Sequence, residues 1–326
     1  ILHFGLGKTQ KIDSIQIEWP DGALQTEESI AINEKISLKQ GELSQQPTQD
    51  KISKTWFSKL KSKISYTHKV KNILDFDRQK LLHFQPSFEG PPLVKGDLNQ
   101  DGKEDIVIGG GKDEPIQVWL QNQYGDFSEK KSPDFSEHQK TVVSDLALAD
   151  LDSDGDLDLY VANGGYHDLK DGSSLLVDQV YLNDGKGTFI QTDQKNPLPN
   201  EGTAVVAIED SNSDGSKVIF VGGSIVPGSY PNHYPNKLLF SNGKEGLIID
   251  KKQTEVLNTL EGIVRDAIWT DIDEDGTRDL ILVGEWMPIT VFLNKNGTLE
   301  KQTNYFLESR TNEGWWNTIS STDLNN

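Results

Sequence analysis

Aspartates recur at alternate positions in this chain. Residues 97–105 read Asp-Leu-Asn-Gln-Asp-Gly-Lys-Glu-Asp, and the same spacing of carboxylates or amides, with glycine sixth and aspartate ninth, returns at 150–158 and 271–279. A copy at 210–218 keeps the first six positions but has valine at the ninth, and 323–326 begins a fifth copy. Hard cations such as Ca²⁺ take about six to eight oxygen ligands. The spacing therefore predicts a series of calcium loops.

Each position of the loop has an expected role. Positions 1, 3 and 5 direct side-chain oxygens at one centre, position 7 offers its backbone carbonyl, and position 9 closes the loop. Position 6 is Gly102, Gly155, Gly215 or Gly276, where the chain must turn sharply and a Cβ would obstruct it. The candidate metal ligands are Asp97, Asn99, Asp101, Lys103, Asp105, Asp150, Asp152, Asp154, Asp156, Asp158, Asp210, Asn212, Asp214, Ser216, Asp271, Asp273, Asp275, Thr277 and Asp279.

An EF-hand is the obvious alternative, and position 12 argues against it. That loop requires a bidentate glutamate there, whereas these copies have Ile108, Val161, Val221 and Leu282. Short β-branched runs follow each loop, and they are too short for helices. We therefore expect the loop to lie between two strands. The expected strands after the loops are 106–110, 159–162, 219–223 and 280–284.

The copies begin at residues 97, 150, 210, 271 and 323, so the period is slightly above fifty. A repeat of this length is typical of one supersecondary unit in a propeller or another array. Within each unit an apolar run precedes the loop, and a hairpin follows the second strand. Asn-Gly and Asp-Gly pairs at 184–185, 242–243 and 296–297 favour tight hairpin turns. Four antiparallel strands per repeat make one propeller blade.

These units resemble the FG-GAP or VCBS repeats of integrin-α-type β-propellers. The resemblance implies blades that carry Ca²⁺ loops, and seven blades in a ring. Residues 2–7 and 15–22 resemble the small domain called ASPIC/UnbV, which is found with such repeats in cartilage-acidic-protein-like and bacterial surface proteins. We thus expect an all-β chain with part of an ASPIC/UnbV-like domain at 1–42, a linker at 43–80, and about four and a half propeller blades at 81–326.

The first segment is predicted to contain strands at 12–19, 23–28 and 35–39, with a Pro-Asp-Gly turn at 20–22. Residues 41–50 are polar and rich in glutamine, as in a linker. Residues 56–64 fit a short amphipathic helix or a solvated connector equally well. Because the chain starts and stops inside motifs, we expect it to be a piece of a longer protein.

The net charge of −19 disfavours nucleic acid and anionic membranes as partners. The chain has no cysteine, so it has neither disulfides nor thiolate metal ligands. It contains no run of 18 apolar residues. Calcium loops of weak affinity are saturated where Ca²⁺ is plentiful. We therefore expect a secreted or cell-surface location.

Long loops after the second strands form a second group of candidates. They lie at 163–172, 224–236 and 284–288, in equivalent places of successive repeats, and should gather on one face. Aromatic rings there suit sugar faces or protein hot spots, although the same rings can instead pack together to hold the loops. Trp315 and Trp316 are expected in the core. The candidate ligand-face residues are Tyr166, His167, Tyr230, His233, Tyr234 and Trp286.

No nucleophile and base pair stands out in the sequence, so catalysis has little support. The first hypothesis is a non-enzymatic surface protein that binds glycan or protein ligands in adhesion. Ca²⁺ would fill three sites, and a fourth is open at 210–218. The alternatives are a polysaccharide-processing, lyase-like enzyme or glycan-uptake accessory, and a structural part of a larger surface complex.

Overall fold

The chain divides into two units, Ile1–Ser62 and Lys63–Asn326. Residues 63–80, part of the linker expected at 43–80, thus fall in the second unit. The computed structural model describes residues 4–5, 7–20, 22–41, 63–69, 73–88, 90–111, 113–132, 134–135, 140–192, 197–211, 215–243, 246–302 and 313–322. Residues 56–64, which fit a short helix or a connector equally well, fall almost wholly outside these residues.

The first unit contains a β-hairpin. Strands β1 (Ser14–Glu18) and β2 (Leu24–Glu28) pair antiparallel, and Gly22 turns the chain with a φ of 81°. The backbone N–H of Gly22 donates to the carbonyl of Trp19 (2.8 Å), as the Pro-Asp-Gly turn predicts. The strand expected at 35–39 is wrong. Ser29 has a left-handed backbone just after β2, and the Gln25 side chain, not a partner strand, bonds the carbonyl of Lys39.

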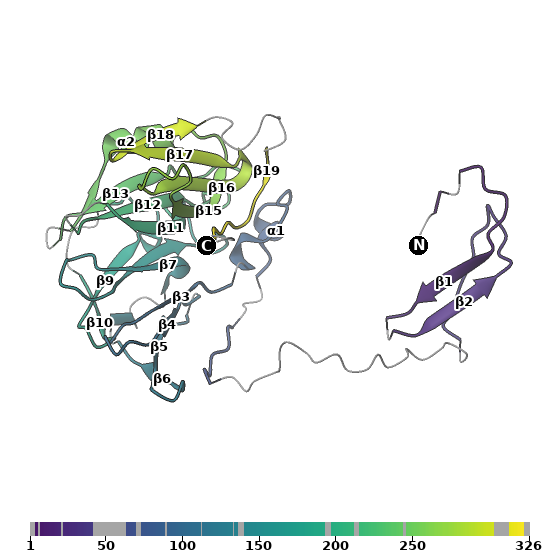
Figure 1. The fold of residues 1–326 in the computed structure, drawn as a ribbon, viewed down its shortest axis with the longest axis horizontal. Coiled ribbons are helices and arrows are strands. Elements are labelled where there is room, and N and C mark those ends of the chain that lie inside the picture. The colour runs from purple at the N-terminus through teal and green to yellow at the C-terminus, as the bar shows by residue number, and fades with distance from the viewer. Residues whose placement is uncertain are drawn as a thin grey trace. The chain divides into compact units, whose positions relative to one another are not determined.

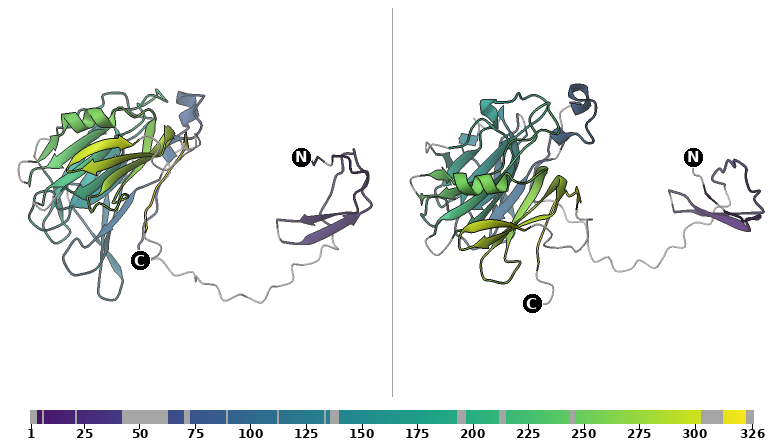
Figure 2. Two further views of the ribbon diagram at one scale, coloured as in Figure 1. Left: turned by 45° about the horizontal axis from the view of Figure 1, so that its top comes forward. Right: turned by 90° about the horizontal axis from the view of Figure 1, so that it is seen from above.

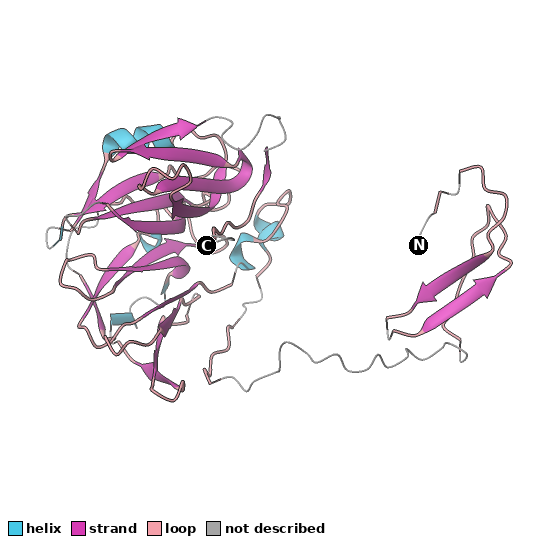
Figure 3. Cartoon of the chain, viewed as in Figure 1, coloured by secondary structure: helices cyan, strands magenta, loops and turns pink. Residues whose placement is uncertain are grey.

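Four consecutive antiparallel sheets of the second unit make the chain all-β apart from short helices (Figures 1 and 3). Each sheet contains strands in chain order, and each calcium-type loop joins its first two strands, as expected. The strands are β3 (Leu93–Gly96), β4 (Asp105–Ile108), β5 (Gln117–Gln121), β6 (Phe127–Lys130); β7 (Val142–Ala149), β8 (Asp158–Gly164), β9 (Gln179–Asn183), β10 (Phe189–Gln191); β11 (Thr203–Asp210), β12 (Lys217–Gly223), β13 (Lys237–Ser241), β14 (Leu247–Ile249); β15 (Ile263–Thr270), β16 (Asp279–Pro288), β17 (Thr290–Lys295), β18 (Thr298–Gln302).

The sheets stack face to face, in order along the chain (Figures 1 and 2). The first strands of neighbouring sheets contact one another: β3 with β7, β7 with β11, and β11 with β15. Along β8, Leu159 and Val161 pack toward the first sheet, whereas Tyr160 and Ala162 pack toward the third. Burial on both faces explains why this strand is continuously apolar rather than alternating.

Three hydrophobic clusters fill the spaces between successive sheets. Each cluster takes side chains from two neighbouring sheets, so that one repeat cannot bury its apolar surface alone. Helix α2 (Lys251–Leu257) closes the space between the third and fourth sheets with the fully buried Leu257. The Asp250 side chain caps this helix by accepting the N–H of Gln253 (3.0 Å).

Residues 313–322 lie against the fourth sheet as the first strand of a further sheet would. The N–H of Trp316 donates to the carbonyl of Gly284 (3.0 Å), just as Val143 donates to Gly110 (3.0 Å). Strand β19 (Glu313–Trp315) also pairs with β16. No packing contact of the kind that joins neighbouring sheets links the described strands of the fourth sheet to those of the first, so the described residues form no closed ring. The fifth loop start, 323–326, lies outside them.

Segment 73–88 precedes the first sheet and includes α1 (Asp75–Arg78) and the 3-10 turn η1 (Pro86–Phe88). It contacts loops that extend from the second, third and fourth sheets. Leu82, for example, is buried in one cluster with Tyr166, Ile225 and Ile263. This segment therefore covers loops that the sequence analysis assigned to an open ligand face. None of the described helices has the length and apolar character that a membrane crossing requires.

Candidate metal centre

The three complete loops share one hydrogen-bond pattern. In each, the first aspartate accepts two backbone N–H groups, from positions 5 and 6. For Asp150 the partners are Asp154 (3.1 Å) and Gly155 (3.1 Å), and Asp97 and Asp271 repeat both bonds. The loop therefore curls around its first carboxylate, and the side chains of positions 3 and 5 are brought to the same side.

The backbone of these loops turns at two left-handed positions. The sixth-position glycines all have positive φ, including 95° at Gly155 and 88° at Gly276, as predicted. Position 4 is also left-handed, with φ of 58° at Gln100, 65° at Ser153 and 60° at Glu274. The sequence did not indicate this second turn, because none of these three residues is glycine.

The ninth-position aspartates join the loop to the rest of the sheet. Asp105, Asp158 and Asp279 are at most 1% exposed. One carboxylate oxygen accepts the N–H of loop position 2, and the other accepts an N–H at the end of the third strand. For Asp158 these partners are Leu151 (2.8 Å) and Asn183 (2.9 Å). Each such aspartate is a buried strut between the loop and its hairpin.

In loop 150–158 the carboxylates of Asp150, Asp152 and Asp158 lie close enough together to hold one ion. The side chain of Asp156, at the position expected to offer its backbone carbonyl, is buried, and its Oδ1 has no hydrogen-bond partner in the structure. Burial first, and then the charges of Asp154 and Asp158, raise the pKa of Asp156 to about 7. Burial also raises the pKa of Asp158 to about 6. This loop concentrates negative charge in a poorly solvated place.

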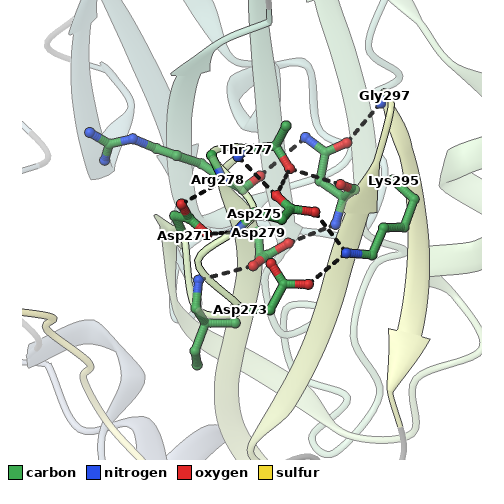
Figure 4. A network of polar contacts seen from close by, with 11 residues as sticks. Asp271, Asp273, Asp275, Thr277, Arg278, Asp279, Lys295 and Gly297 are labelled. Carbon is green, nitrogen blue, oxygen red and sulfur yellow. Dashed lines mark hydrogen bonds and ion pairs between the residues drawn. The ribbon is translucent and has the colours of Figure 1, made fainter.

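In loop 271–279 the gathered carboxylates are Asp271, Asp273 and Asp275. Figure 4 shows Lys295 reaching into this group from the end of β17. Its Nζ lies 2.6 Å from Asp273 Oδ2 and 2.7 Å from Asp275 Oδ2. The hydrogen bond from Lys295 is the largest reason that the pKa of Asp275 falls to about 2. The other oxygen of Asp273 is buried without a hydrogen-bond partner.

Loop 97–105 has the same backbone but a weaker anionic set, because Asn99 replaces an aspartate. The N–H of Asp101 donates to Asn99 Oδ1 (3.0 Å), and that of Lys103 donates to Asp101 Oδ1 (3.0 Å). Burial raises the pKa of Asp105. The lysine beside this loop, Lys95, pairs with Glu104 and not with a ligand position.

The incomplete copy at 210–218 differs from the others. Asn212 and Asp214 lie outside the described residues. Val218 is buried at the ninth position, so the strut is missing, and Ser241 at the end of β13 instead accepts the N–H of Lys217 (2.8 Å). The ammonium of Lys217 bonds Asp210, and Ser216 accepts the N–H of Ser211 through its backbone carbonyl. A lysine thus contacts the first carboxylate here.

A hard divalent cation fits these loops, because their ligands are oxygens and their backbones share one curvature. It would also pair two buried oxygens that have no hydrogen-bond partner, Asp156 Oδ1 and Asp273 Oδ1. Loops 150–158 and 271–279 each gather three carboxylates. Among the described residues, loop 97–105 does not gather three, because Asn99 interrupts the set.

The six ligand-face residues do not form one open surface. Tyr166, Tyr230 and Tyr234 are buried, so their rings are not offered to a ligand. The Arg78 guanidinium bonds the carbonyls of Tyr166 and His167, while Tyr166 donates its hydroxyl to Gln79 (2.5 Å). The alternative that these aromatics hold the loops together therefore describes the three tyrosines.

The two histidines and Trp286 differ from the tyrosines. His167 bonds its neighbour Asp168 (3.0 Å), and His233 bonds the carbonyl of Tyr234 (2.9 Å). Trp286 is 55% exposed and has a φ of 60°, which is rare for a bulky residue. Its indole N–H donates to the Tyr230 hydroxyl (2.9 Å).

Two residues beside Trp286 were missed by sequence reasoning. Trp315, expected in the core, is 43% exposed, and its ring lies 4.9 Å from that of Trp286. His83 lies edge-on to Trp315, with ring centres 4.6 Å apart. Trp315 is exposed because β19 pairs along the edge of β16 at a bulge beside Trp286. No local pattern in the sequence predicts the pairing of β19 with β16. We call His83, Trp286 and Trp315 the aromatic patch.

Comparisons with known proteins agree with the repeats. Residues 97–161 match the family model of the FG-GAP-like repeat, and residues 1–45 match that of ASPIC and UnbV. The first match contains two of the three complete loops. Among solved structures, the crystal structure of the V. cholerae biofilm matrix protein Bap1 is similar at 19% identity and a TM-score of 0.35, over 66% of this chain and 30% of that chain. The search of curated proteins found no match.

Proposed function

We propose that this chain, which carries an FG-GAP-like repeat and an ASPIC and UnbV segment, is a calcium-stabilised β-propeller module of an extracellular or surface protein. It binds a glycan or protein ligand in adhesion and does not catalyse a reaction. The observation that carries the proposal is the common geometry of three acidic loops, each tied to its sheet by a buried aspartate. Weak Ca²⁺ loops are filled at extracellular Ca²⁺ concentrations, so Ca²⁺ loops in an FG-GAP-like repeat fit an extracellular location.

The propeller arrangement is proposed from the way the sheets stack. Successive first strands are neighbours, and β8 and β12 are buried on both faces. In a radial arrangement each blade packs between two others, so its strands are buried on both faces. A ring of seven, as the resemblance implies, requires further blades beside the four described sheets.

Ca²⁺ would act here as a structural clamp. In loop 150–158 the ligands would be the side chains of Asp150, Asp152, Asp154 and Asp158, with Asp156 adding an oxygen or a backbone carbonyl. The ion would supply positive charge to carboxylates that otherwise repel one another. Binding to the folded state alone stabilises it by mass action.

The test is metal analysis and thermal unfolding of the whole 326-residue chain. We expect bound Ca²⁺ after dialysis against millimolar calcium, and a lower Tm in EDTA. The double variant D150N/D152N should lose one equivalent, whereas D126N, which changes an exposed aspartate of the β5–β6 turn, should not. No bound Ca²⁺ together with an unchanged Tm in EDTA would refute the proposal.

We propose the aromatic patch as the ligand surface, with a sugar ring as its occupant. The Trp286 indole is fixed by its bond to Tyr230, whose hydroxyl donates to the buried Glu285 (3.0 Å). Exposed, fixed indole faces with a polar rim suit sugar rings. The left-handed backbone of Trp286 is an outlier of the kind that accumulates at functional sites.

Binding to a glycan array tests this surface. W286A should lose binding at least tenfold, whereas Y124A, which removes an exposed ring at the distant β5–β6 turn, should not. Equal loss in both variants, or binding to protein ligands only, would contradict a sugar-stacking role.

The absence of catalysis is tested separately. Incubation with acidic and neutral polysaccharides should release no unsaturated products. Their appearance at a rate proportional to protein concentration would favour the lyase-like alternative instead.

A further inference from the structure

The ends of the third strands can be compared because the sheets share one register. In each sheet the residue directly after the loop pairs with the third strand: Ile106 with Trp119, Leu159 with Tyr181, Ile219 with Leu239, and Leu280 with Phe292. Three residues after each of these third-strand partners comes the residue where the third strand meets the hairpin turn. Those four residues are Asn122, Asp184, Asn242 and Lys295.

Lys295 is the cation among these four equivalent positions. Its Nζ contacts two of the three carboxylates that gather in loop 271–279, at 2.6 Å and 2.7 Å. The Lys295 side chain is 38% exposed, and those of Asp273 and Asp275 are 20% and 34% exposed. In the second sheet the equivalent Asp184 turns to its own hairpin, where it accepts the N–H groups of Lys186 (2.9 Å) and Thr188 (3.0 Å).

We propose that Lys295 is a tethered counter-cation which makes loop 271–279 a weaker calcium site than loop 150–158. The ammonium supplies one of the positive charges that the gathered carboxylates require. A divalent ion must displace it from Asp273 and Asp275 before it can use both side chains. Loop 271–279 then fills only at higher Ca²⁺, while its shape is maintained in the meantime by Lys295.

The proposal rests on Ca²⁺ binding to these loops, but it concerns the difference between two of them. An ammonium close to a divalent ion repels it, and a single charge at about 4 Å near a protein surface changes an affinity by roughly tenfold or more. Salt screens this repulsion over a Debye length of about 8–10 Å. The difference between the two sites should therefore narrow at high ionic strength.

Calorimetric titration of the full chain with Ca²⁺ tests the proposal. The D97N/D101N/D150N/D152N background removes the sites proposed at 97–105 and 150–158 and leaves loop 271–279 to be measured. In that background, K295M should tighten Ca²⁺ binding about tenfold, and K295R should bind as the parent does. K301M removes a charge on the adjacent strand β18, where the Lys301 Nζ bonds the backbone carbonyl of Thr259, and it should change the affinity little.

A second readout follows the folded state without metal. In EDTA, K295M should have a lower Tm than the parent, because three gathered carboxylates lose their counter-cation. If K295M and its parent bind Ca²⁺ equally, while the unmodified chain still binds Ca²⁺ at loop 150–158, only the role of Lys295 is overturned. Weaker binding in K295M would overturn it as well. Failure of the unmodified chain to bind Ca²⁺ at any loop would overturn the proposed function itself.

Discussion

Loops 150–158 and 271–279 have the same backbone, but the pKa values of their carboxylates shift in opposite directions. Both curl around a first aspartate, and both are tied to a third strand by a buried ninth aspartate. In the first loop burial and neighbouring carboxylates raise the pKa of Asp156 to about 7. In the second, Lys295 lowers the pKa of Asp275 to about 2. Local sequence thus sets the shape of both loops, while in the second loop a residue from the hairpin changes the charge balance.

The largest expected effect concerns the feature that the two loops share. Asp158→Ala and Asp279→Ala each leave two backbone N–H groups without their carboxylate. Hydrogen bonds to charged groups contribute about 1.5–3 kcal/mol each, so we expect each variant to lose about 4 kcal/mol of unfolding free energy in EDTA. Denaturant unfolding measures this loss. A large loss at one strut and none at the other would show that the loops are built differently.

Calcium should separate the two loops. When free Ca²⁺ is about 100 times the Kd of loop 150–158, we expect that loop to stabilise the parent chain by about 2.7 kcal/mol, and the tenfold weaker loop 271–279 to add about half as much. D150N/D152N should therefore remove the larger contribution, and D271N/D273N the smaller one. Thermal unfolding at fixed free Ca²⁺ measures both. Equal losses in the two double variants would contradict the ranking of the sites.

Part of the pH dependence of the metal-free protein should also come from loop 150–158, in addition to Asp145 and Asp178, whose pKa values burial raises to about 7 and about 6. Unfolded aspartates titrate near 3.9, whereas folded Asp156 titrates near 7 and Asp158 near 6. Between these values the folded state binds more protons than the unfolded state. Stability in EDTA should therefore fall as the pH rises from about 4 to 7, and remain level above that.

Asp156→Asn isolates this contribution. At pH 8 in EDTA the variant should be more stable than the parent by about 2 kcal/mol, since each unit of pKa shift corresponds to about 1.4 kcal/mol and solvent reduces the full value. At pH 4 the two proteins should unfold alike. Lower stability of the variant at pH 8 would indicate that Asp156 is paired and not repelled.

The smallest effect comes from exchanging the residues that distinguish the hairpins. Asp184→Lys places an ammonium in the second sheet at the position of Lys295, and we expect it to weaken Ca²⁺ binding at loop 150–158 about tenfold. Asp184→Asn, which keeps an acceptor in the turn without adding a cation, controls for the lost turn bonds. If both variants bind Ca²⁺ equally, position 184 does not reach the loop.

Much of the fold could be predicted from the repeats. Strand order, hairpins and the place of each loop between two strands all followed from the period and the β-branched runs, because these signals are local. The strand expected at 35–39 was wrong, since a strand forms only where another strand offers hydrogen bonds. The open aromatic face was only partly predictable, because segment 73–88 bonds loops of two sheets from far away in the chain.

The sequence by itself determined the chemistry of the acidic loops: which residues carry oxygen, where glycine permits the left-handed turn, and how often the unit recurs. Only the tertiary structure decided which carboxylates gather, which are struts, and where a cation meets them. Lys295 is 20 residues from Asp275 in the chain and 2.7 Å from it in space. The physical reason is that spacing along a strand fixes the direction of side chains, whereas charge balance depends on every group that folding brings near.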